Sequence, residues 1–234
     1  MQPTARVIEI FSSIQGEGVY VGHPHLFVRF WNCNMTCGYC DTDYKGPYEE
    51  YSVQQLSSEV ERLLLEDGPF QAVSLTGGEP LLWKDFLKAW LPWLKNKGQR
   101  TYLETNGTLP QAFAEVLHWI DIIAMDFKPP SATFDRAYWK EHEEFLRLAY
   151  RARKEIFVKI IATRQTTDVE MEYSLRLIAS VHSRIPVVLQ PVTPWGIVSE
   201  GPSPEQIQRW QWCAGSLLKD VRVIPQVHRL LGVR

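Results

Sequence analysis

The segment HLFVRFWNCNMTCGYCDT (25–42) places an apolar run directly before three closely spaced cysteines. Residues 25–30 are rich in aromatic and branched side chains, a composition that predicts a β-strand. Cys33, Cys37 and Cys40 follow with the spacing C-x3-C-x2-C, and they are three of the four cysteines in the chain. The sequence therefore predicts a strand whose carboxyl end leads into a loop of clustered thiols.

Clustered thiols of this kind can share a metal, form a disulfide or be reactive. A disulfide framework is disfavoured because the sequence shows no secretory signal and because pairing within the cluster leaves one thiol over. A zinc site needs a fourth ligand, usually from a second Cys or His pair, and Cys213 stands alone. Three thiolates suit a [4Fe–4S] cluster with one iron left open for a small molecule. We favour the cluster and keep a zinc or structural site as the alternative.

Length and charge narrow the class of protein. With 234 residues the chain is expected to form a single domain (1–234), slightly short of the about 250 residues of a complete eight-stranded barrel. A net charge of −2 argues against a non-specific nucleic-acid binder. No run of about 18 apolar residues is present, so no membrane-spanning helix is expected. Because clustered thiols need a reducing compartment, we expect a cytoplasmic protein without direct nucleic-acid or membrane contacts.

Runs rich in β-forming residues alternate with runs of helical periodicity. The predicted strands are 25–30, 72–80, 100–107, 121–127, 155–163 and 186–194, with a final extended segment at 220–228; the predicted helices are 52–68, 83–96, 111–120, 169–181 and 204–219. This alternation predicts βαβ units and a parallel sheet, here a partial (β/α)6-type barrel in the α/β class. The charged, helix-like segment 131–150 carries no motif, and we interpret it as an insertion that covers the cluster or contacts a second subunit.

Each unusual motif follows a predicted strand. These motifs are the cysteine loop, TGGEP (76–80), ETNG (104–107), DFKPP (126–130) and QPVTP (190–194). Ligands of such sheets bind beyond the carboxyl ends of the strands, so we expect these loops to form one site. The two glycines of TGGEP permit close backbone approach to an amino-acid-like ligand, although alone this motif is an ordinary turn.

The order of the motifs resembles one enzyme family. IQGEG (14–18), Arg29, the three cysteines and CDT (40–42) occur in the order seen in the 7-carboxy-7-deazaguanine synthase (QueE) family of the radical S-adenosylmethionine (SAM) superfamily, and QVHRLLGVR (226–234) resembles the tail of that family. GGEP resembles the motif that holds the methionyl amine of SAM. The cysteine spacing and GGEP indicate only the superfamily, whereas IQGEG, CDT and the tail indicate the family. The resemblance covers essentially the whole chain and implies a radical SAM barrel.

The resemblance also implies a reaction, its cofactors and its partners. The family converts 6-carboxy-5,6,7,8-tetrahydropterin to 7-carboxy-7-deazaguanine and ammonia by a radical ring contraction, which leads to queuosine and related 7-deazapurines. The implied cofactors are a [4Fe–4S] cluster, SAM that is regenerated, and Mg²⁺. The implied partners are a flavodoxin-type electron donor and a second copy of the chain in a homodimer. Two alternatives stay open: a glycyl-radical-enzyme activase that acts on a protein, and a non-enzymatic iron–sulfur electron-transfer module.

Two segments, 1–24 and 221–234, are implied to bind the substrate. Gln15 can donate and accept hydrogen bonds along a pterin edge. Arg29 can bind the substrate carboxylate bidentately or form a structural salt bridge. Arg234 is expected to act through its terminal carboxylate. The predicted substrate-binding residues are Ile14, Gln15, Gly16, Glu17, Arg29, Thr76, His228 and Arg234.

Further residues are implied as cofactor ligands. Because SAM and the cluster start the reaction, no side chain is predicted as a catalytic group. Cys33, Cys37 and Cys40 would bind the cluster, and the Thr42 hydroxyl would bind Mg²⁺, which often takes only one or two oxygen ligands from the protein. The predicted SAM-binding residues are Tyr39, Cys40, Asp41, Gly78, Glu79, Asp126, Phe127, Lys128, Gln190, Pro191, Val192 and Thr193.

Overall fold

The computed structural model describes residues 2–233, and within this range nine strands form one sheet. The strands are β1 (Thr4–Ile14), β2 (Pro24–Phe30), β3 (Glu49–Ser52), β4 (Ala72–Gly77), β5 (Thr101–Thr105), β6 (Ile122–Phe127), β7 (Glu155–Ala162), β8 (Val187–Pro191) and β9 (Val221–Val223). Their order across the sheet is β3-β1-β2-β4-β5-β6-β7-β8-β9. β2 and β4 to β9 are parallel, whereas β1 is antiparallel to both β2 and β3. The predicted α/β fold with a mostly parallel, partial barrel is confirmed.

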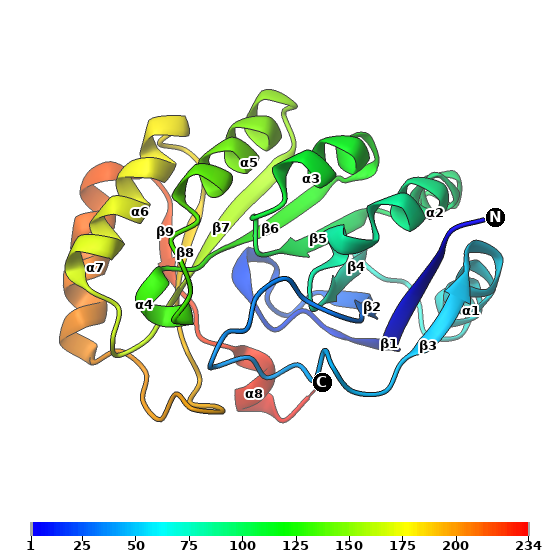
Figure 1. Ribbon diagram of the computed structural model, residues 1–234, viewed down its shortest axis with the longest axis horizontal. Helices are drawn as coiled ribbons and strands as arrows, with labels where there is room; N and C mark the ends of the chain where they lie inside the picture. Colours follow the sequence, from blue (N-terminus) through cyan, green and yellow to red (C-terminus); the bar gives the residue numbers. More distant parts are fainter. Residues whose placement is uncertain (1, 234) are drawn as a thin grey trace.

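Helices connect the parallel strands and cover the outer face of the curved sheet (Figure 1). The covering helices are α1 (Val53–Glu66), α2 (Lys84–Asn96), α3 (Pro110–Val116), α5 (Trp139–Arg151), α6 (Asp168–Val181) and α7 (Pro204–Leu217). The short helices α4 (Pro130–Thr133) and α8 (Val227–Leu231) lie away from them, and the 3-10 turns are η1 (Gly18–Tyr20), η2 (Pro80–Trp83) and η3 (Leu117–Trp119). Capping boxes define the starts of α1, α6 and α7. In α1, the Ser52 side chain accepts from the Gln55 backbone N–H, and the Gln55 side chain accepts from the Ser52 backbone N–H. Among residues 2–233, no helix is both long and apolar enough to cross a membrane.

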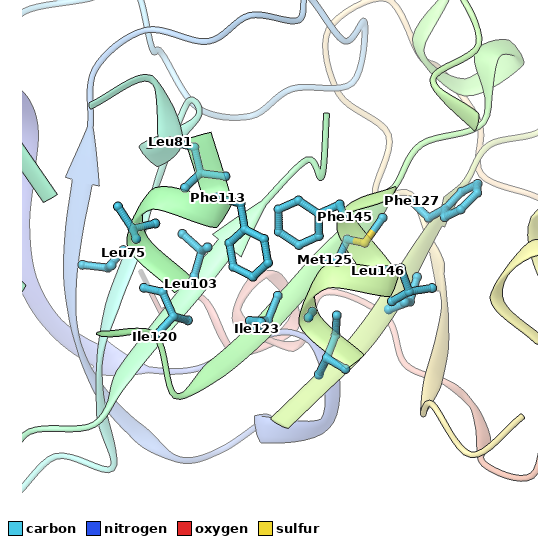
Figure 2. Close-up of a cluster of buried hydrophobic side chains, with 14 of the residues drawn as sticks. Leu75, Leu81, Leu103, Phe113, Ile120, Ile123, Met125, Phe127, Phe145 and Leu146 are labelled. Atoms are coloured by element: carbon cyan, nitrogen blue, oxygen red, sulfur yellow. The ribbon is translucent and has the colours of Figure 1, made fainter. Parts of the chain in front are cut away.

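The main core lies between the sheet and these helices. Figure 2 shows part of it, where Phe113 of α3 and Phe145 of α5 stack with ring centroids 4.0 Å apart, near Ile123 and Met125 of β6. All four side chains are fully buried. α5 is therefore a sheet-covering helix of the barrel. Our interpretation of 131–150 as an insertion is wrong for the part that forms α5, because its apolar face packs on the sheet.

A second apolar cluster fills the amino-terminal end of the barrel interior. It contains Tyr102 of β5 and Phe157 of β7, and Tyr20 of η1 packs against Tyr102 edge to face. Gly18 has a φ of +68°, and a Cβ there would lie 2.6 Å from Cζ of Phe157, so only glycine fits this approach. The interior is thus closed at this end, and open space is left at the carboxyl ends of the strands.

The predicted strands correspond to β2 and β4 to β8, and the predicted helices to α1, α2, α3, α6 and α7, with shifted ends. The antiparallel strands β1 and β3 were not predicted. The prediction of one extended segment over 220–228 is wrong in its second half, because β9 ends at Val223 and α8 begins at Val227. The physical reason is a tertiary contact: the Val227 backbone N–H donates to the Gly16 carbonyl at 2.9 Å, which docks α8 on the start of the chain.

Candidate active site

A cavity of about 530 Å³ lies at the carboxyl ends of the parallel strands. Its wall contains residues from every motif that follows a predicted strand, together with IQGEG and the tail. The predicted site residues that line it are Ile14, Gln15, Gly16, Glu17, Arg29, Cys33, Cys37, Tyr39, Cys40, Asp41, Thr42, Thr76, Gly78, Asp126, Lys128, Gln190, Val192 and His228. The structure therefore brings segments from both ends of the sequence to one site.

A few predicted site residues do not line the cavity. They are Glu79, Phe127, Pro191 and Thr193, while Arg234 lies outside the described residues. Phe127 is a core side chain that packs against Trp139. The Glu79 carboxylate is fully buried and accepts hydrogen bonds from the Asn106 N–H at 2.8 Å and from Thr105 Oγ1. Glu79 thus joins the GGEP turn to the ETNG turn, and burial raises its pKa to about 7.

The cysteine loop packs directly on the GGEP turn. The Glu79 N–H donates to the Asn32 carbonyl at 2.9 Å, and the Gly78 N–H donates to the Phe30 carbonyl at 3.0 Å. A Cβ on Gly78 would overlap the Asn32 carbonyl oxygen and lie 3.0 Å from the Cys33 backbone nitrogen. Gly78 therefore serves close backbone packing, whatever it does for a ligand.

The three clustered cysteines are free thiols and partly buried. Burial, together with the nearby Glu79 charge, raises the pKa of Cys33 to about 11, and burial also raises the pKa of Cys40. Such thiols ionise only beside a cation, which iron supplies, so Cys33, Cys37 and Cys40 fit a cluster. Among residues 2–233, no three Cys, His, Asp or Glu side chains converge on one metal ion. A [4Fe–4S] cluster does not need such convergence, because each thiolate binds a different iron.

One buried polar atom fits a bound ligand in the same cavity. Within the part of the chain that the structure describes, Gln190 Oε1 is buried without a hydrogen-bond partner. A buried amide oxygen is normally paired, so a donor group of a ligand is expected there. On the neighbouring wall, Lys128 Nζ lies 3.1 Å from Asp126 Oδ2 and 5.6 Å from the ring centre of Tyr39. These side chains belong to the predicted SAM site.

Arg29 forms the salt bridge that was one of its two predicted alternatives, and its binding of the substrate carboxylate stays a prediction. Its Nε donates to Glu9 Oε1 at 2.8 Å, which is a salt bridge, and its guanidinium also lines the cavity. Its Nη1 donates to Thr42 Oγ1 at 3.3 Å. The predicted Mg²⁺ ligand Thr42 therefore lies beside the Arg29 guanidinium, so a cation at its hydroxyl would be favoured by an anionic ligand close to both charges.

The IQGEG segment is held by a residue that the sequence analysis left without a role. Gln15 Nε2 donates to Glu104 Oε1 at 2.8 Å, and Thr76 Oγ1 donates to Glu104 Oε2 at 2.7 Å. Glu104 itself lines the cavity. The sequence signal for Glu104 was a carboxylate near the end of a predicted strand, which is where the other motifs also lie.

Lys159 was missed entirely. It lies in β7 with 2% of its side chain exposed, lines the cavity, and pairs with Glu17 and with Asp126. Burial opposes ionisation of Glu17, but the Lys159 charge and hydrogen bond outweigh it and lower the pKa of Glu17 to about 2. A lysine in the middle of the predicted apolar strand 155–163 was the available signal.

The tail forms part of the cavity wall, and Figure 1 shows α8 beside the cysteine loop. Gln226 Nε2 donates to Glu17 Oε1 at 2.8 Å, and Arg229 Nη2 donates to Asp41 Oδ2 at 2.8 Å. His228 packs on Gly16, where a Cβ would overlap the ring Nδ1 and lie 2.7 Å from Cγ. Gln226 and Arg229 were not among the predicted site residues, although the tail segment was.

Comparison with known proteins agrees with this geometry. Residues 30–178 match the family model of the radical SAM superfamily. The chain is 38% identical to the 7-carboxy-7-deazaguanine synthase of Geobacter sulfurreducens, over 99% of this chain and 98% of that protein. It is 33% identical to the synthase of Methanothermobacter thermautotrophicus, over 98% of each chain.

Among solved structures, QueE from Escherichia coli superposes with a TM-score of 0.63 at 18% identity, and the match covers 96% of this chain and 95% of that one. This likeness shows a shared fold. Together with the near full-length sequence identities, it establishes that the chain belongs to the 7-carboxy-7-deazaguanine synthase family of the radical SAM superfamily.

Proposed function

We propose that this protein is a 7-carboxy-7-deazaguanine synthase, a radical SAM enzyme of queuosine biosynthesis. It would convert 6-carboxy-5,6,7,8-tetrahydropterin to 7-carboxy-7-deazaguanine with loss of ammonia. The observation that carries the proposal is the meeting of IQGEG, CDT and the tail around one cavity that the three cysteines also line. The 38% identity to the Geobacter sulfurreducens synthase over 99% of the chain supports it.

The size and closure of the cavity favour a small substrate. Its volume of about 530 Å³ falls within the range of ordinary small-molecule sites. α8 lines the cavity and is hydrogen-bonded to Gly16 and Asp41. The protein substrate of an activase would need a more open approach to the cysteines, so this geometry argues against that alternative.

Cys33, Cys37 and Cys40 would hold the [4Fe–4S] cluster, which with SAM bound supplies the 5′-deoxyadenosyl radical. The chain's own residues fix where that chemistry occurs. Lys128 would meet the methionyl carboxylate of SAM, and Gln190 Oε1 would accept a hydrogen bond from SAM; both residues line the cavity, and this oxygen has no partner among the described residues. The closed barrel floor and the tail exclude water and competing hydrogen donors.

The substrate would lie between IQGEG and the tail. Arg29 offers its guanidinium to the substrate carboxylate, and Glu17 offers acceptor oxygens to the N–H groups of the pterin. Glu104 holds Gln15 and Thr76 in place beside it. His228 and the terminal carboxylate of Arg234 complete the proposed substrate-binding set, with Ile14 and Gly16 contributing backbone groups.

Mg²⁺ is proposed to bind Thr42 together with the substrate. The ion would need the substrate carboxylate beside Arg29 to balance its charge. It would assist the ring contraction by withdrawing electron density from the substrate oxygens.

The remaining proposals concern the setting of the enzyme. We propose a cytoplasmic homodimer that receives electrons from a flavodoxin-type donor and has no direct nucleic-acid partner. A single domain would carry the substrate-binding segments 1–24 and 221–234. The family resemblance and the need of clustered thiols for a reducing compartment support these points.

The test is an anaerobic turnover assay. The cluster is reconstituted and reduced, SAM, Mg²⁺ and 6-carboxy-5,6,7,8-tetrahydropterin are added, and products are read by mass spectrometry. We expect 7-carboxy-7-deazaguanine. Cleavage of SAM without this product would reject the substrate and favour the activase alternative. No cleavage of SAM by a verified, reducible cluster would favour an electron-transfer module.

A further inference from the structure

Lys159 occupies an unusual position for a lysine. It sits inside a strand whose other central residues, Val158 and Ile160, are wholly buried apolar side chains, and only 2% of its own side chain is exposed. Buried lysines are rare unless they are paired. Its ammonium meets Glu17 and, at 3.0 Å, Asp126 Oδ1. Neither the proposed reaction nor the sequence motifs account for it.

The two acids that Lys159 joins belong to different halves of the site. Glu17 is part of IQGEG, and its second carboxylate oxygen, Oε1, accepts from Gln226 of the tail. Asp126 ends β6 and pairs with Lys128, which lies over Tyr39 of the cysteine loop. Lys159 is thus the direct link between the substrate side and the SAM side of the cavity.

We propose that Lys159 is a positioning residue for the substrate, because it fixes the Glu17 carboxylate at the cavity wall as an acceptor for the amino-pyrimidinone edge of the pterin. This inference rests on the proposed function. An ionised carboxylate has about four acceptor positions. Lys159, Gln226 and Gln190 donate to three of them, which leaves one for an N–H donor of that edge.

The surrounding charges show why a cation is needed at this place. The acidic groups nearest Glu17 are Asp126 of β6, Glu104 of β5 through Gln15, and Asp41 of the cysteine loop through Gln226. Lys128 and Arg229 are already paired with Asp126 and Asp41. Without Lys159 Glu17 would take up a proton more readily, because burial raises its pKa and only the neutral donors Gln226 and Gln190 would still lower it.

The test compares Lys159→Met with Lys154→Met in anaerobically reconstituted protein. Lys154 lies immediately before β7, away from the cavity, and donates to the His118 carbonyl. This variant therefore controls for the loss of a lysine next to the same strand. Equilibrium binding is measured separately for 6-carboxy-5,6,7,8-tetrahydropterin and for SAM, and folding is checked by thermal unfolding and iron content. Whether the wild-type protein binds the pterin tests the proposed function independently of the Lys159 variants.

We expect Lys159→Met to weaken pterin binding about 10- to 100-fold, the size of a lost charge-assisted hydrogen bond, with a change below about threefold for SAM. In this variant pterin affinity should rise with pH as Glu17 loses its proton, beyond any slope of the wild type. Lys159→Arg, which keeps the cation, should restore the wild-type pH profile. If Lys159→Met does not fold, Lys159→Gln replaces it, since glutamine keeps a hydrogen-bond donor but not the charge. We expect the same binding and pH results from it.

Three outcomes would overturn the inference in a protein whose wild type binds the pterin. One is pterin affinity in the folded neutral variant equal to that of Lys154→Met. Another is an equal loss of pterin and SAM affinity, which is general damage to the cavity. The third is a pH dependence of pterin affinity that is the same in Lys159→Met and in the wild type.

Discussion

Replacing Gly78 by alanine should disrupt the contact between the GGEP turn and the cysteine loop. Gly78 is not among the residues with a positive φ, so its backbone accepts alanine and only the close approach forbids it. The new Cβ would overlap the Asn32 carbonyl oxygen and press on the Cys33 backbone nitrogen at 3.0 Å. Backbone atoms cannot rotate away, so the loop must shift by roughly 1 Å to restore van der Waals separation.

The cost of this shift can be worked from the bonds that it breaks. The Glu79 N–H to Asn32 carbonyl bond of 2.9 Å would be lost or lengthened, at about 1–3 kcal/mol for a buried unpaired group. Overpacking adds about 1–3 kcal/mol. For a chain of this length, a total of about 3 kcal/mol lowers the Tm by about 6–12 °C. A loop displaced by about 1 Å should also cost about a hundredfold in turnover.

The assay is thermal unfolding of the metal-free protein, followed by iron content and SAM binding after reconstitution. Gly215→Ala is the matched control, because nothing lies within 4 Å of a Cβ at this exposed position of α7. Its helix propensity gain of up to about 1 kcal/mol should leave the Tm unchanged or slightly raised. A Gly78→Ala protein with the Tm and SAM affinity of the control would refute the reasoning, because the close backbone approach would then contribute nothing to the free energy of unfolding.

Three further predictions follow from the same site. Thr42→Ala should abolish the stimulation of turnover by Mg²⁺ while SAM binding is retained; a full Mg²⁺ response in this variant would reject the metal assignment. Glu104→Gln removes a charged acceptor from both Gln15 and Thr76 and should raise the KM for the pterin about tenfold, with a smaller effect on the Kd for SAM; equal effects on both ligands would contradict it. Burial raises the pKa of Glu79 from its ordinary value of 4.5 to about 7. Between these two pH values the folded metal-free protein keeps the proton, whereas the unfolded chain has lost it. The free energy of unfolding should therefore fall by about 3 kcal/mol as the pH rises from about 4.5 to 7. Denaturant unfolding at pH 5 and pH 8 should show this slope in the wild type and a flatter one in Glu79→Gln; identical slopes would mean that Glu79 ionises normally.

The parallel part of the fold was predictable because its signals are local. Strands buried on both faces read as continuous apolar runs, and the helices between them show their own period and caps, as at Ser52. The antiparallel strand β3 (Glu49–Ser52) carries no such signal, because it is a short polar edge strand that exists through pairing with β1. α8 has five residues and no side-chain cap, so tertiary contacts of the tail with Gly16, Glu17 and Asp41 define it.

The site was predictable to the extent that motifs mark it. The cysteines, GGEP and IQGEG occur at recognisable spacings, and their meeting followed from the rule for strand ends. Glu104 belongs to the ETNG motif but had no predicted partner, and Lys159 belongs to no motif. Their partners lie far away in the sequence: Glu104 accepts from Gln15, 89 residues earlier, and Lys159 pairs with Glu17, 142 residues earlier. Long-range ion pairs of this kind become visible only once the barrel has brought the strands together.

The tail contact has a consequence for the order of events during synthesis. Gln226 bonds Glu17, 209 residues earlier in the chain, and approaches Asp41 of the cysteine loop, 185 residues earlier. Contacts of such separation close the largest loops and form after the local ones. The cysteines therefore leave the ribosome long before the segment that covers them is made. Throughout that interval the loop is open to an iron–sulfur donor, and the cover arrives only when the barrel beneath it is complete.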